Sequence, residues 1–315
     1  SEIIFTSSGT EADNLILQNA VINLGVKVII TSKIEHHAVL HTCYHLNKTY
    51  NTQIKYVNVD IDGVIDLQHL EELLATSTEK TLVSLMYINN EIGNILPVKQ
   101  ISALCKNYSA LFHSDTVQAI GHFQIDLQEV PIDFIVASAH KFHGPKGVGF
   151  AYFKKGIGIL PMLHGGDQEK GARSSTENVY GIIGLEKALQ IAYANLEEDK
   201  KYIENLKSYF IKELLNISNT INFNGLSSNI EKSSYTILSV RVPVQNNMLL
   251  FSLDLAGIAV SGGSACQSGS NKGSHVLAEI LDEKQADDTS IRFSFSKYTT
   301  KQELDVCLSK LKELL

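Results

Sequence analysis

A lysine that follows a predicted strand stands in the segment with the most unusual composition. Lys141 lies within SAHKFHGPKG at 138–147, where small and polar residues crowd together. A partly desolvated lysine amine gives up its proton readily, and the neutral amine forms a Schiff base with an aldehyde cofactor. From the lysine alone, a surface residue in a turn is the better interpretation.

A carboxylate and an amide follow a second predicted strand. Asp115 lies at the carboxyl end of that strand, where open α/β sheets bind their ligands. Its charge could keep the nitrogen of a pyridoxal ring protonated, and this makes the ring a strong electron sink. Gln118, three residues later, could reach the ring's phenolic oxygen. The alternative role of Asp115 is to cap the turn that follows it.

The segment FTSSGTE at 5–11 passes from a strand into a helix through small residues. The N–H groups at such a helix start and the positive end of the helix dipole favour a phosphate, and Gly9 lets the backbone approach it closely. N-capping by Ser8 explains the same residues almost as well.

One of the four cysteines has a setting unlike the others. Cys266 lies in VSGGSACQSGS at 260–270, a loop too rich in glycine and serine for a core, so we expect an exposed and mobile thiol. The other three, which lie in helical patterns, are expected to be inert packing: Cys43, Cys105 and Cys307. A bystander thiol is the alternative for Cys266.

His36 at a helix start and Arg292 in a strand do not indicate a function by themselves. Each becomes a candidate site residue only when it is considered together with the other segments.

Alternating strands and helices must position these groups. Apolar runs predict strands at Val28 to Thr31, Ile54 to Val57, Leu82 to Tyr87, Leu111 to His113 and Phe134 to Val136. Helical spacing of apolar residues predicts helices at Thr10 to Leu24, His37 to Asn47, Leu67 to Ala75 and Val98 to Tyr108. This order indicates an α/β fold with a mostly parallel central sheet flanked by helices.

The alternation of short strands and helices ends at about residue 155. Beyond it, a glycine-rich loop precedes a long helical stretch from Glu177 to Leu215. We therefore predict a large domain at 1–217 and a small α+β domain at 218–315, which carries the cysteine loop. In the small domain, a strand at Thr236 to Val242 and a helical tail at Lys301 to Leu315 are expected.

Composition excludes several classes of function. The 315 residues include 27 basic and 34 acidic ones, and without a dense Lys/Arg block this balance argues against nucleic-acid binding. No apolar run reaches membrane-spanning length, so we expect a soluble protein. The cysteines show no CxxC pairing, which argues against a zinc site or a disulfide framework and favours a reducing, cytoplasmic location.

Taken together, the segments resemble the cysteine desulfurases, the NifS/IscS-like branch of the class V aminotransferases among fold-type I pyridoxal-phosphate enzymes. Eight motifs carry the resemblance in order along nearly the whole chain: SSGTEADN at 7–14, EHHAVL at 35–40, NNEIG at 89–93, HSDTVQ at 113–118, SAHKFHGPKGVG at 138–149, RSSTENV at 173–179, SGGSACQSGS at 261–270 and IRFSFSKYTT at 291–300. Relatives carry a substantial further segment ahead of the strand that begins this chain.

The resemblance implies a role for each candidate residue. Lys141 would hold pyridoxal 5'-phosphate as the internal aldimine, Asp115 would pair with the ring nitrogen, and His36 would stack over the ring. Gln118 would contact the phenolic oxygen. The phosphate would be held by Gly9, Thr10, Ser138 and His140, and by Thr176 of the neighbouring subunit in a homodimer. Asn90 and Arg292 would bind the substrate carboxylate, for which a guanidinium is well suited.

The implied reaction converts L-cysteine to L-alanine and leaves the sulfur on Cys266 as a persulfide, for an acceptor such as an iron–sulfur scaffold or a thiolation enzyme. Two alternatives stay open: another class V enzyme, such as a selenocysteine lyase or an aminotransferase, and a non-catalytic sulfur carrier or scaffold subunit. Ser175 departs from the family, which usually has glycine before Thr176. Serine avoids some backbone conformations that glycine reaches, so the contact of Thr176 with the phosphate is expected to shift.

Overall fold

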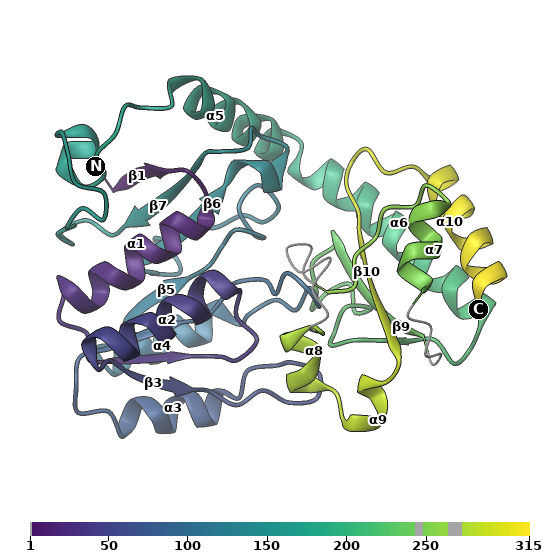
Figure 1. Ribbon diagram of the computed structural model, residues 1–315, viewed down its shortest axis with the longest axis horizontal. Helices are drawn as coiled ribbons and strands as arrows, with labels where there is room; N and C mark the ends of the chain where they lie inside the picture. The colour runs from purple at the N-terminus through teal and green to yellow at the C-terminus, as the bar shows by residue number, and fades with distance from the viewer. Residues whose placement is uncertain (1, 243–247, 264–272) are drawn as a thin grey trace. The chain divides into compact units, whose positions relative to one another are not determined.

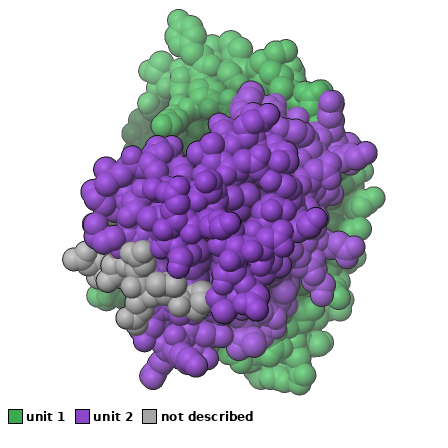
Figure 2. Space-filling view, turned by 90° about the vertical axis from the view of Figure 1, so that its right-hand side faces the viewer, with its two compact units in different colours: residues 1–58, 65–88, 96–196 green, residues 59–64, 89–95, 197–315 purple. Residues whose placement is uncertain are grey.

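The computed structural model describes residues 2–242, 248–263 and 273–315. The chain divides into two compact units, which Figure 2 colours separately. The first comprises residues 1–58, 65–88 and 96–196, and the second comprises 59–64, 89–95 and 197–315. Two short segments of the first half of the chain thus belong to the second unit. The division into domains at residues 217 and 218 stays a prediction.

A seven-stranded sheet forms the centre of the first unit, in the order β1-β7-β6-β5-β4-β2-β3 (Figure 1). The strands are β1 (Ile3–Thr6), β2 (Val28–Thr31), β3 (Gln53–Tyr56), β4 (Thr81–Ser84), β5 (Leu111–Ser114), β6 (Phe134–Ser138) and β7 (Gly149–Phe153). Neighbouring strands from β3 to β6 pair in parallel, whereas β7 runs antiparallel to both β6 and β1. Strands β2, β4 and β6 are buried along their whole length, as expected of a sheet covered on both faces.

The helices of the first unit are α1 (Gly9–Ile22), α2 (His37–Tyr50), α3 (Leu67–Ala75), α4 (Val98–Asn107) and α5 (Val179–Ala194). Helices α1 and α2 lie side by side, and α1 also contacts β6 and β7 (Figure 1). The side chain of Asp66 accepts a hydrogen bond from the His69 N–H and so caps α3. The core between α1, α2 and the sheet includes Leu15, Ile16 and Phe134.

The second unit holds a three-stranded antiparallel sheet in the order β10-β9-β8. Its strands are β8 (Asn222–Phe223), β9 (Ile237–Val242) and β10 (Thr289–Ser294), and its helices are α6 (Leu196–Ile217), α7 (Leu249–Leu255), α8 (His275–Ile280), α9 (Glu283–Ala286) and α10 (Lys301–Leu314). The rings of Phe210 and Phe293 meet edge to face with centroids 5.0 Å apart. A capping box between Thr300 and Glu303 begins α10.

The predicted fold class is confirmed: an α/β fold with a mostly parallel sheet. Two elements differ from the sequence prediction. The long helical stretch is two helices, α5 and α6, because the chain breaks at Asn195, where φ is −111° and ψ is 11°. Strand β7, hidden in a glycine-rich motif, was not predicted. In the described part of the chain, no helix is long and apolar enough to cross a membrane.

Candidate active site

The carboxyl ends of β5 and β6 meet the N-terminus of α1 at one edge of the first unit's sheet. Gly9 makes this approach possible. A Cβ added to Gly9 would lie 2.5 Å from Val117 Cγ2 and 3.8 Å from Ser138 Cβ. A larger residue at position 9 would therefore push α1 away from the segments that carry Asp115 and Lys141.

Asp115 is 5% exposed and lies directly after β5. Its Oδ1 accepts a hydrogen bond from the Val117 N–H at 2.9 Å, so it caps the following turn, which was the alternative role considered for it. Burial raises the pKa of Asp115, while the charges of His36 and Lys141 lower it in part. His36 and Lys141 are therefore close enough to Asp115 for their charges to act on its carboxyl group.

Lys141 lies in η1 (Ala139–Phe142), a 3₁₀ helix that directly follows β6, and its side chain is exposed. Beside it, His140 Nδ1 lies 3.0 Å from Ser138 Oγ. Burial lowers the pKa of His140, and the charges of Lys141 and Lys146 lower it further, so this ring is neutral at neutral pH. Hydroxyl, imidazole and amine groups thus follow one another at the end of β6.

The N-terminus of α1 is not capped by Ser8, whose side chain makes no capping hydrogen bond. Capping by Ser8 was the alternative to phosphate binding, and it is wrong. Glu11 Oε2 instead accepts a hydrogen bond from the Ser7 N–H at 2.7 Å, and Arg173 Nε donates to Glu11 Oε1 at 2.8 Å. Burial alone would raise the pKa of Glu11, but the hydrogen bonds from Arg173 and Ser7 outweigh it and lower that pKa. Thr176, three residues after Arg173, is exposed.

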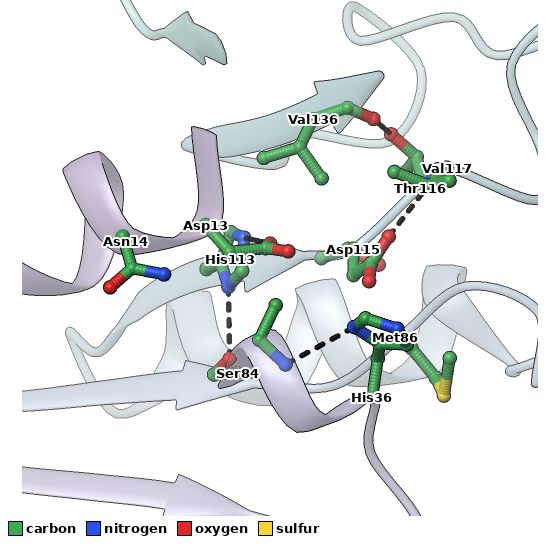
Figure 3. A network of polar contacts seen from close by, with 12 residues as sticks. Asp13, Asn14, His36, Ser84, Met86, His113, Asp115, Thr116, Val117 and Val136 are labelled. Atoms are coloured by element: carbon green, nitrogen blue, oxygen red, sulfur yellow. Dashed lines mark hydrogen bonds and ion pairs between the residues drawn. The ribbon is translucent and has the colours of Figure 1, made fainter. Parts of the chain in front are cut away.

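His36 is the N-cap of α2, and its Nδ1 accepts a hydrogen bond from the Ala38 N–H at 3.1 Å (Figure 3). The residue before it, Glu35, is buried and was not singled out from the sequence. Glu35 Oε1 accepts hydrogen bonds from the Met86 N–H at 3.0 Å and from the Ser32 hydroxyl at 3.1 Å. Burial raises the pKa of Glu35 to about 8. Glu35 therefore ties the segment that carries His36 to the chain just beyond β4.

A second buried polar group was also missed. His113 lies between Ser84 and Asp13 in the interior of the first unit (Figure 3). Asp13 and His113 belong to two of the motifs that carry the family resemblance, yet sequence periodicity assigns both simply to core-facing positions. The signal available in the sequence was a charged residue inside an otherwise apolar helical pattern, because such residues are rarely buried without a partner.

Asn90 and Arg292 lie together in the second unit. Arg292 Nη1 donates a hydrogen bond to the Asn90 carbonyl oxygen at 2.8 Å. Arg292 is on β10, next to β9, while the Asn89 side-chain oxygen accepts hydrogen bonds from the N–H groups of Glu91 and Ile92 and so shapes the turn that presents Asn90. Asn90 and Arg292 are 202 positions apart in the sequence.

Three of the cysteines are buried, as predicted: Cys43, Cys105 and Cys307. Cys266 lies outside the described residues. Just before that segment, a Cβ at Gly263 would lie 3.2 Å from Glu91 Oε2, and just after it, the Ser274 hydroxyl donates to the same carboxylate oxygen. Glu91, which was not singled out from the sequence, thus contacts the chain on both sides of the cysteine segment.

Gln118 is half-buried in the turn that follows β5.

Comparison with known proteins identifies the family of the chain. The aminotransferase class-V family matches residues 1–307. A protein of Dictyoglomus turgidum called cysteine desulfurase IscS is 41% identical over 316 residues, which cover all of this chain and 79% of that protein. A protein of the same name from Clostridium botulinum (strain Hall) is 39% identical over 317 residues, again over all of this chain and 79% of that protein. A solved NifS-like protein is 38% identical with a TM-score of 0.89, covering 99% of this chain and 82% of that one.

The chain therefore belongs to the class V aminotransferase family and has the fold of its solved NifS-like relative. Within that family, relatives named cysteine desulfurase match it along its whole length.

Ser175 has a backbone φ of 125°, in the region that favours glycine. We expect Ser175→Gly to raise the free energy of unfolding by about 1 kcal/mol, because relief of the strain exceeds the extra freedom of glycine in the unfolded chain. The midpoint of urea unfolding measures the change.

Ser252→Gly is the matched control for this substitution. Ser252 lies within α7, where glycine costs about 1 kcal/mol, so the control should lower the midpoint. A lower midpoint for Ser175→Gly as well would show that the backbone at this position is not strained.

Proposed function

We propose that this protein is a pyridoxal-phosphate-dependent cysteine desulfurase that uses Lys141, Asp115 and His36 at the sheet edge of the first unit, and Cys266 as the sulfur acceptor. The observation that carries the proposal is the convergence of a buried carboxyl, an exposed lysine and a helix N-terminus at this edge. An amine for covalent attachment, a carboxyl for a pyridine nitrogen and backbone donors for a phosphate are the three things that pyridoxal phosphate requires.

The donor set fits the cofactor at each end. The N-terminus of α1 lacks a side-chain cap, and Gly9 leaves no room there for a side chain, so backbone N–H groups of Gly9 and Thr10 would hold the phosphate. Ser138 and His140 add a hydroxyl and an imidazole to the same anion site, and Thr176 of a second copy adds another hydroxyl.

At the ring, each residue has a separate task. When bound, pyridoxal phosphate supplies an electron sink for an attached amino acid. Asp115 would hold the proton on the ring nitrogen, Gln118 would contact the phenolic oxygen and His36 would lie over the ring. Lys141 Nζ would hold the cofactor covalently and would serve as the group that moves a proton when a substrate is bound.

L-cysteine is the substrate that this arrangement suits. Arg292 and Asn90 would grip its carboxylate, because a guanidinium bonds both oxygens at once. The Cys266 thiolate attacks the substrate sulfur: the carbon–sulfur bond breaks with its electron pair left on carbon, a sulfur–sulfur bond forms, and a proton completes alanine. The persulfide then passes to an acceptor protein, such as an iron–sulfur scaffold.

A homodimer is part of the proposal, since Thr176 would serve the neighbouring site. Apolar side chains on α5 support a contact with a second copy. Val179, Tyr180 and Ile183 lie within a turn of one another and are 53%, 91% and 59% exposed.

The test is to load the purified protein with pyridoxal phosphate and add L-cysteine. We expect an absorption band near roughly 400 nm from the lysine-bound cofactor, followed by alanine and sulfide in equal amounts when a reductant is present. A protein without this band would instead be a carrier or scaffold subunit. Sedimentation of the same sample checks the homodimer, and a monomer would contradict that part of the proposal.

A further inference from the structure

A buried histidine connects the helix that carries Gly9 to the strand that leads to Asp115. His113 Nε2 lies 3.3 Å from Asp13 Oδ1, and His113 Nδ1 lies 2.9 Å from Ser84 Oγ. Asp13 belongs to α1, one helical turn after Gly9, while Ser84 and His113 are partners in register at the ends of β4 and β5. Three elements therefore meet at one imidazole ring (Figure 3).

Water does not reach this contact. The side chains of His113 and Asp13 are 0% and 1% exposed. Among the described residues, neither Asp13 Oδ1 nor His113 Nε2 has a hydrogen-bond partner, and each lies within ion-pair distance of the other at 3.3 Å. Buried polar groups in folded proteins are almost always paired, so these two atoms have to satisfy each other.

His113 and Asp115 also lie on one continuous extended segment. They are two residues apart on an extended chain, so their side chains point to the same side. The chain keeps this conformation beyond the end of β5, because the Asp115 carbonyl oxygen accepts a hydrogen bond from the Tyr87 N–H at 2.9 Å. A shift of the imidazole ring is therefore passed on to the Asp115 carboxyl group.

We propose that His113 is a positioning residue that sets the separation between two anchors of the cofactor, the α1 N-terminus for the phosphate and Asp115 for the ring nitrogen. This inference rests on the proposed function. The phosphate and the nitrogen of pyridoxal phosphate are attached to one flat ring, so their separation varies little. Two anchors that are held at the matching separation in the free protein bind both groups without a cost for rearrangement.

The charge state of the bridge supports this role. Burial lowers the pKa of His113 to about 3, and burial together with the charges of Asp115 and Glu35 raises the pKa of Asp13 well above its usual range. At neutral pH the ring is therefore neutral, and burial disfavours a charge on the acid. A bridge with an uncharged ring places no positive charge beside Asp115, so it fixes geometry without competing with the pyridine nitrogen for that carboxyl group.

The test compares pyridoxal phosphate with pyridoxal, which lacks the phosphate and so uses only one of the two anchors. Dissociation constants are measured by absorbance for both compounds in the absence of L-cysteine, for wild type and for His113→Leu. We expect the preference of the wild type for the phosphorylated compound to fall roughly tenfold or more in the variant, since small misplacements of paired anchors are costly. The affinity for pyridoxal should change little.

Leu46→Ala controls for lost stability, because Leu46 is buried in α2 and touches neither anchor. It should lower the melting temperature and leave the preference for the phosphate unchanged. If His113→Leu does not fold, Ser84→Ala removes one of the two contacts and should reduce the preference by a smaller factor. An unchanged preference in a folded His113 or Ser84 variant would overturn the inference, whereas a wild-type protein that binds neither compound would overturn the proposed function as well.

Discussion

Replacing Lys141 with alanine is expected to abolish the covalent attachment of the cofactor and to reduce alanine formation at least about a hundredfold, the scale on which a positioned acid–base group contributes to a rate. Lys141 is exposed at the end of β6, and its charge acts on the buried Asp115. In the described part of the chain, Asp115 has no other lysine among the groups that determine its pKa. Without Lys141, neither the attachment nor the proton transfer can occur.

Lys146→Ala is the matched control for this prediction. Lys146 is an exposed lysine of the same motif, five residues further on, and has no assigned role. The control should keep both the absorption band near roughly 400 nm and the rate of alanine formation. If the Lys141 variant kept the band and the Lys146 variant lost it, the assignment of the reactive lysine would be wrong. Absorbance after gel filtration separates covalent from loose binding.

Replacing Cys266 with alanine is expected to abolish sulfide formation while the cofactor band remains. None of the other three cysteines can take over. Cys43, Cys105 and Cys307 are 0%, 2% and 5% exposed. Burial raises the pKa of Cys43 to about 12, that of Cys105 to about 12 and that of Cys307 to about 11. Because the thiolate is the nucleophile, these thiols are unreactive at neutral pH.

Alanine and sulfide should be measured in parallel for wild type, Cys266→Ala and Cys307→Ala. The Cys307 variant controls for the loss of a thiol, and it should keep sulfide formation even if α10 loses some stability. Activity retained by the Cys266 variant at the wild-type rate would favour a selenocysteine lyase or an aminotransferase that uses the same cofactor site. Loss of the cofactor band in that variant would also contradict the proposal, because Cys266 has no part in holding the cofactor.

Local sequence was enough to predict most of the large sheet. The bounds predicted for β2 and α3 agree with the structure at Val28 to Thr31 and Leu67 to Ala75. Apolar runs and helical spacing are local signals, so they identify elements that are buried on both faces or amphipathic. The break between α5 and α6 was missed because the apolar pattern continues through Asn195.

The types of residue at the candidate site could also be predicted, because eight motifs in a fixed order leave little room for coincidence. Their interactions could not. That Arg173 pairs with Glu11 at the start of α1 and that Glu91 contacts both sides of the cysteine segment depend on residues far apart in the chain. Strand pairing and close approaches at glycine set the distances between such residues, and neither produces a periodic pattern in the sequence.

The amino-acid sequence by itself determined the alternation of elements, the family and the chemical groups available for the reaction, since these depend on local patterns and on residue identity. Only the tertiary structure decided which groups share one environment. Asp13, Ser84 and His113 come from three separate elements, and folding brings them into one buried environment that no segment has alone. Exclusion of water couples such residues, and it exists only once the chain has folded.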